Sequence, residues 1–219
     1  MNYLWERFAI PVFPARTRVW LDGAERPDLS DTRGEGPVHY IVQGGSHLPP
    51  KIDVKSGETA YLTAILDGAA GKIEINAAKG AKFKAGIFIE NKGAAEIIIM
   101  ANHLGDNSEI SVDVRIEAAA GSSTAASAAA NIPRGLKNIE NSIDFGVLAD
   151  RGVKSVRLSP GQFIKSAGVK ASHGAAIQKE NPAQIIYLEQ QGLSENESAA
   201  ALREAFRAAA FDHLPKTAA

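Results

Sequence analysis

The feature that most constrains the fold of this chain is a series of short apolar runs between residues 36 and 172, separated by turns that are mostly marked by glycine. Many runs follow one pattern, as in residues 57–62 and 93–99, where glycine and small or polar residues precede alternating apolar positions. No helical periodicity of useful length interrupts the series. Many short strands with repeated turn chemistry are typical of a sandwich, a barrel or a β-solenoid.

Small side chains favour the solenoid among these three architectures. Alanine, glycine, serine and threonine recur along the series and dominate residues 118–130. Small residues let neighbouring rungs approach closely, and a solenoid of stacked rungs leaves terminal edges that need a cover or a partner. A helix is the alternative for residues 118–130, because alanine is the best helix former. Gly121 and the polar residues after it weaken that alternative. We therefore expect a mainly β chain with a β-solenoid core.

Two helices are predicted near the C-terminus. Asn181 is a candidate N-cap, Pro182 occupies the first helical position, and Gly192 ends the helix about three turns later. Ser194 begins a second helix and forms a capping box with Glu197. The expected organisation is an N-terminal capping segment (1–35), a β-helix core (36–178) and a C-terminal helical segment (179–219).

Composition narrows the function classes. The chain has 219 residues, a net charge of −1 and no cysteine. Neither nucleic-acid nor anionic-membrane binding is expected, since both rest on an excess of basic residues. Disulfides, thiolate metal ligands and a cysteine nucleophile are excluded within this chain. A cytoplasmic protein is expected, because no apolar run approaches the length of a spanning helix and the N-terminus is a poor signal peptide.

Histidine and carboxylate residues offer two candidate kinds of chemistry. His173 is expected in a polar turn between the last strand and the first helix, where it can serve as a metal ligand, a proton carrier or a hydrogen-bonded structural residue. Asp106, Glu109 and Asp113 lie near His103 in the sequence. They allow a β-solenoid enzyme that acts on carbohydrate, with two carboxylates as acid and base. A polar turn leading into a strand explains them equally well.

One known family resembles several segments of the chain. Residues 170–175 (KASHGA) and 184–193 (QIIYLEQQGL) resemble the most specific signature of the SufB/SufD iron–sulfur assembly proteins. Residues 18–30 are similar to an early strand-and-turn segment of SufD-like proteins. Residues 132–135 and 147–152 resemble rungs of the same family.

The resemblance implies a right-handed parallel β-helix followed by C-terminal helices, and a non-enzymatic scaffold role in iron–sulfur cluster assembly. The C-terminal helices would dock an ABC-type ATPase of the SufC kind. Edge strands would pair either two copies of this chain or this chain and a second SufB/SufD-like subunit. His173, with Ser172 and Lys170, is the candidate cluster-assembly site at that interface, and His173 is a candidate metal ligand shared with the partner. The candidate ATPase contacts are Tyr187, Leu188, Leu193, Leu202 and Phe206.

Departures from the family pattern shape these expectations. Gly174 follows His173 where SufB members carry glutamate, and Ala171 occupies a position that is often cysteine in SufD. The chain is therefore SufD-like, and we expect it to bind no cofactor stably by itself. A transient iron–sulfur cluster at a shared interface stays open. Two alternatives also stay open, the carbohydrate-acting enzyme and a structural homodimer without an ATPase partner.

Overall fold

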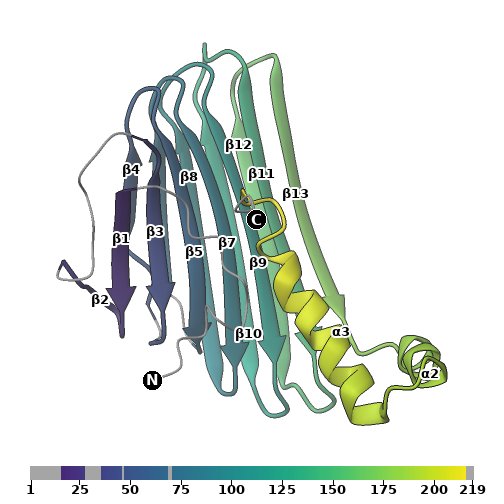
Figure 1. The fold of residues 1–219 in the computed structure, drawn as a ribbon. Helices are drawn as coiled ribbons and strands as arrows, with labels where there is room; N and C mark the ends of the chain where they lie inside the picture. The colour runs from purple at the N-terminus through teal and green to yellow at the C-terminus, as the bar shows by residue number, and fades with distance from the viewer. Residues whose placement is uncertain (1–15, 28–35, 46, 69–70, 216–219) are drawn as a thin grey trace.

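Two parallel β-sheets form the body of the chain (Figure 1). A computed structural model describes residues 16–27, 36–45, 47–68 and 71–215. From residue 38 to residue 178 the strands alternate between the two sheets, so that each pair of strands makes one rung. This arrangement is a parallel β-solenoid, and the fold class expected from the sequence is confirmed.

Sheet A holds eight strands of the described chain and sheet B holds five. The strands of sheet A are β1 (Arg16–Leu21), β2 (Ala24–Glu25), β3 (Val38–Gln43), β5 (Thr59–Asp67), β7 (Lys82–Asn91), β9 (Glu109–Ala118), β11 (Ile139–Ala149) and β13 (Val169–Gln178). The strands of sheet B are β4 (Lys51–Val54), β6 (Gly71–Ala77), β8 (Ala94–His103), β10 (Ser123–Ile132) and β12 (Ser155–Ile164). Every pair of neighbouring strands is parallel except β1 and β2.

The interval between equivalent residues grows along the solenoid. It increases from 22 residues (Val38 to Ala60) to 31 residues (Ile110 to Asn141). Within the strands the register is continuous, so the additional residues enter longer strands and the turns between them. This growth explains why the sequence shows repeated strand patterns without a fixed repeat.

The core lies between the two sheets and is filled from both. Phe83 of β7 and Phe145 of β11 are fully buried, and isoleucines from both sheets surround them. Each such side chain contributes about 1.5–3 kcal/mol when it is removed from water. Residues 123–132 form strand β10, not the helix that alanine content alone allows. Ala126, Ala128 and Ala130 face the core there, because small side chains fit where successive rungs stack closely.

A ladder of polar side chains runs along the outside of sheet B. The Asn76 side-chain amide donates to Asp53 Oδ1 at 2.8 Å, and the Asn102 amide donates to Asn76 Oδ1 at 2.9 Å. The three residues occupy equivalent positions on β4, β6 and β8. Side-chain hydrogen bonds between equivalent positions reinforce the register that the backbone sets.

Two helices follow the last strand, as expected from the sequence. Helix α2 (Pro182–Gln190) begins at Asn181, whose Oδ1 accepts a hydrogen bond from Ala183 N at 3.0 Å. Helix α3 (Glu195–Ala209) begins at the Ser194–Glu197 capping box. Helix α3 lies across the outside of sheet A, whereas α2 lies beyond the β13 edge (Figure 1). In the described chain, none of the helices is long and apolar enough to cross a membrane.

Strand β1 lies inside the segment that the sequence assigned to an N-terminal cap. It pairs in parallel with β3 and so extends sheet A. The rest of that prediction falls largely on residues 1–15 and 28–35, which lie outside the described part. At the other boundary, β13 ends at Gln178 and α2 begins at Pro182.

Candidate interaction site at the open end of the solenoid

The last rung of the solenoid, made of β12 and β13, has two free edges. β12 pairs with β10 and β13 pairs with β11, and neither has a second strand partner among the described residues. Each strand is ten residues long. Their outward N–H and C=O groups therefore form a template on which another chain can pair.

Apolar side chains that would face the next rung lie exposed at this end. Ile177 is 56% exposed, whereas Val147, opposite it on β11, is fully buried. Ile164 is 43% exposed, whereas Ile132, opposite it on β10, is fully buried. Val156, Leu158 and Val169 are half-buried on the same inner surface. We call this surface, with both edge strands, the open end.

The structure divides the candidate site residues between two faces of β13. His173 lies opposite Ile143, which is a core residue, so the imidazole belongs to the inner surface and is exposed at the open end. Lys170 and Ser172 lie on the outer face of sheet A. There the Lys170 ammonium pairs with Glu140 at 2.8 Å, and the Ser172 hydroxyl lies 3.0 Å from Ser142 Oγ. The three residues therefore do not form one cluster.

The expectation that His173 lies in a turn is wrong. It lies in the middle of β13, which pairs with β11 from Val169 to Gln178. Gly174 does not break the strand, because it makes room for a neighbouring side chain. A Cβ atom at position 174 would lie 2.1 Å from Asp144 Oδ1 on β11. A strand interior tolerates glycine where another group approaches this closely.

Helix α2 carries a second exposed apolar surface. None of its residues is buried. Ile186 is 54% exposed and Tyr187 is 61% exposed, and Leu193 just after the helix is 36% exposed. Leu188 is half-buried. Sequence reasoning missed Ile186, although the run of four apolar residues at 185–188 contains the signal. Four consecutive residues cover all sides of a helix, so a helix at a protein surface cannot bury them all.

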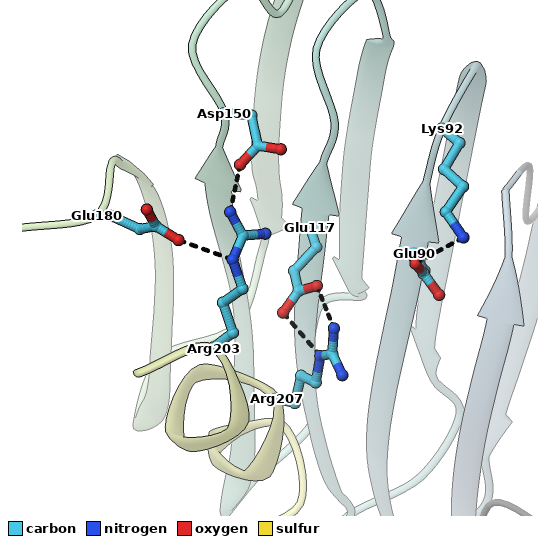
Figure 2. Close-up of polar contacts among 7 residues, drawn as sticks. All are labelled: Glu90, Lys92, Glu117, Asp150, Glu180, Arg203 and Arg207. Atoms are coloured by element: carbon cyan, nitrogen blue, oxygen red, sulfur yellow. Dashed lines mark hydrogen bonds and ion pairs between the residues drawn. The ribbon is translucent and has the colours of Figure 1, made fainter. Parts of the chain in front are cut away.

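Helix α3 is held against the solenoid by two arginines (Figure 2). Arg207 Nε lies 2.7 Å from Glu117 Oε1, and Arg207 Nη2 lies 2.6 Å from Glu117 Oε2. Its guanidinium also lies 5.3 Å from the centre of the Phe88 ring. Arg203 binds Asp150 at 2.6 Å and Glu180 at 2.7 Å.

These contacts decide how the candidate docking residues of α3 are placed. Leu202 and Phe206 are half-buried, and Ala210 and Leu214 beyond the helix are buried. The α3 segment packs back onto sheet A, so α2 is the part of the helical segment that offers a largely free surface. The candidates Tyr187 and Leu193 lie on that free surface.

The carboxylates considered for sugar chemistry each have a local partner. Asp106 Oδ1 accepts a hydrogen bond from Lys137 N at 2.9 Å, and Glu109 pairs with Lys84 at 3.3 Å. Asp113 pairs with Arg115 at 2.9 Å. Burial raises the pKa of Asp113 to about 6 despite the arginine. These contacts fit polar residues on the surface and in turns of a solenoid.

Metal ligation by several side chains finds little support. No group of three or more His, Cys, Asp or Glu residues that could hold a metal ion occurs in the described ranges. His103 is fully buried, with Nδ1 2.8 Å from Ser108 Oγ and Nε2 3.3 Å from Asn141 Oδ1. Burial lowers the pKa of His103, which favours a neutral, structural imidazole.

The fold and the site define a parallel β-solenoid with one open end and a helical pair attached beside it. No protein-family model matches the chain, and no curated protein matches it either. Function is therefore argued from the residues and their placement.

Proposed function

We propose that this chain is a non-catalytic scaffold subunit of a SUF-type iron–sulfur cluster assembly complex. One observation carries the proposal. The two segments that most resemble the SufB/SufD signature fall on the two most exposed apolar surfaces described above. Residues 170–175 lie on the unpaired strand β13, and residues 184–193 cover most of α2 and the turn after it. A subunit that acts through its partners needs such surfaces. The proposal carries with it a cytoplasmic location.

The open end is the proposed pairing surface for a second β-helix subunit. Free edges on β12 and β13 can extend both sheets across the interface, with main-chain hydrogen bonds supplying affinity. The exposed inner side chains Ile164 and Ile177 would gain the cover that equivalent residues have within the stack. Pairing at this end also brings His173 to the subunit boundary.

Helix α2 is the proposed docking surface for a SufC-type ATPase. Ile186, Tyr187 and Leu193 supply apolar contact area there. Arg203 links this helical segment to the last rung, because it binds Glu180 before α2 and Asp150 in the turn before β12. ATP-driven movement of the docked ATPase would therefore reach the open end and change access to His173.

The cluster is cargo in this proposal. The chain has no thiolate to offer, and His173 is its single candidate ligand at the open end. Cysteine ligands would have to come from the partner, since thiolates hold most biological iron–sulfur clusters.

Co-expression with the SufC-type ATPase of the same organism tests the ATPase part of the proposal, read by size-exclusion chromatography with light scattering. Deletion of residues 181–219 is a poor variant, because it would uncover the surface under Ala210 and Leu214. The sharper variant is Ile186→Asp with Tyr187→Asp, and Gln190→Asp on the same helix is the matched control. We expect co-elution of the wild type and the control with the ATPase, and separate elution of the double variant. Separate elution of the wild type would refute the proposal.

Complementation of a strain that lacks the endogenous subunit tests the role of His173. His173→Ala should lower the activity of cluster-dependent enzymes, whereas Ser172→Ala, on the opposite face of the same strand, should leave it near the wild-type level. Equal activity of both variants would remove His173 from the proposal and leave the docking function standing.

A further inference from the structure

The segment that forms the open end carries charge of one sign. Between residues 151 and 179 there are six cationic residues and no aspartate or glutamate, in a chain whose net charge is −1. All six are exposed. They are Arg151, Lys154, Arg157, Lys165, Lys170 and Lys179.

These cations surround the open end on every side. Arg151 and Lys154 lie in the turn before β12, and Lys179 follows the end of β13. Lys165 lies in the turn at the other end of the rung, between β12 and β13. Arg157 lies on the outer face of sheet B and Lys170 on the outer face of sheet A. The open end thus has an apolar centre and a basic rim.

The nearest carboxylates do little to neutralise this rim. Asp150 and Glu180 flank the segment, and both bind Arg203 of α3 (Figure 2). Glu140 pairs with Lys170 in an exposed contact, and no other residue of the rim has a carboxylate partner among the described side chains. The rim therefore keeps most of its positive charge.

An apolar centre inside a charged rim is the usual anatomy of a protein–protein interface. Two copies of this chain meeting at their open ends would place one basic rim against another, and like charges facing each other suppress association. An acidic rim on the partner would instead attract and orient it. Free strand edges and exposed isoleucines suit a β-sheet partner better than a nucleic acid, which is bound mainly through its phosphates.

From this charge pattern we infer that the open end pairs with a different protein that has an acidic β-sheet edge, and not with a second copy of this chain. The inference rests on the proposed function for the idea that the open end pairs with a β-helix subunit. It adds the chemistry of the partner, because the charge of the rim selects between the two subunits that the proposed function leaves open.

The test uses the full chain itself as the acidic probe. The variant Lys154→Glu/Arg157→Glu/Lys165→Glu keeps the apolar centre and the edge strands but reverses much of the rim. Sedimentation equilibrium would be measured for wild type alone and for an equimolar mixture of wild type and variant. We expect the mixture to pair with a Kd roughly a hundredfold lower than that of wild-type self-association, and to weaken as salt rises.

A matched control reverses three exposed lysines far from the open end, Lys55→Glu/Lys72→Glu/Lys79→Glu. This control should pair with wild type no better than wild type pairs with itself. Circular dichroism and thermal unfolding of both variants check that the fold is kept. If the reversed-rim variant does not fold, wild type alone decides the matter, because screening of the rims should strengthen self-association as salt rises.

Three results would overturn the inference. The first is tight wild-type self-association at low salt, and the second is a mixture that stays monomeric. The third is tight, salt-sensitive binding of a fluorescein-labelled 30-nucleotide RNA that the rim variant loses, which would assign the rim to a nucleic acid. The substitutions leave α2 untouched, so co-elution with the ATPase would persist in each case if the proposed function is right. Loss of α2-dependent co-elution would overturn the proposed function separately.

Discussion

Replacing Arg207 by alanine tests the attachment of α3 to sheet A. The Glu117 carboxylate is only 6% exposed, and Arg207 satisfies both of its oxygens at 2.6–2.7 Å. Leaving a buried carboxylate without its cation costs about 3–5 kcal/mol. The Arg207 side chain is 25% exposed, so water can enter the space it leaves. We therefore expect Arg207→Ala to lower the free energy of unfolding by about 2–3 kcal/mol.

Urea unfolding measures this loss, and hydrogen exchange locates it. Exchange should rise in α3 and in residues 210–214 before it rises in the strands. The matched variant is Arg203→Ala, whose partners Asp150 and Glu180 are 33% and 32% exposed. Because solvent screens these two pairs, its loss should be about 1 kcal/mol.

The double variant Glu117→Leu/Arg207→Met completes the test. Replacing both partners by apolar residues removes the buried charge, so most of the stability lost in Arg207→Ala should return. The reasoning fails if Arg207→Ala costs no more than Arg203→Ala. It also fails if the double variant is as unstable as Arg207→Ala.

Three further predictions follow from buried groups. Since burial raises the pKa of Asp113 to about 6, from an ordinary value of 3.8, wild-type stability should fall as pH rises between these values. In urea titrations, Asp113→Asn should reduce that fall by about 2 kcal/mol. Burial lowers the pKa of His39 from 6.5 to about 4, so stability should be lost as pH falls between these values. His39→Gln should remove about 3 kcal/mol of this acid sensitivity in the same measurement. Gly86→Ala would place a Cβ atom 2.5 Å from the Phe211 ring and should lower stability by about 1–3 kcal/mol in thermal unfolding. Gly93→Ala, which meets nothing within 4 Å, should stay within about 0.5 kcal/mol of wild type.

The architecture could be predicted from sequence because its signals are local. Turn glycines and alternating apolar residues mark each strand, and Asn181, Ser194 and Glu197 mark the helix starts. The alternative for residues 118–130 shows the limit of local signals. Alanine suits a helix by itself, and only the pairing of β10 with β8 and β12 makes the same residues a strand.

The candidate site was predictable in part, because its decisive contacts join residues that are distant in sequence. His173 looks like a turn residue until β11 pairs with β13 along its whole length. Arg207 looks like a solvent-facing helical residue, since Glu117 lies 90 positions away. The basic rim is visible in the sequence as a segment without carboxylates. Its meaning depends on the segment being the last rung.

Helix α3 changes how the solenoid should unfold. In a stack of rungs each unit touches only its neighbours, so stability is local and the ends fray first. Here one helix contacts Phe88 on β7, Glu117 on β9 and Asp150 after β11, and so spans three successive strands of sheet A. Its contact with Glu180 also ties down the exit from β13. The rung most exposed to fraying is thereby coupled to the interior of the stack, and the C-terminal half of the solenoid should melt as one cooperative unit.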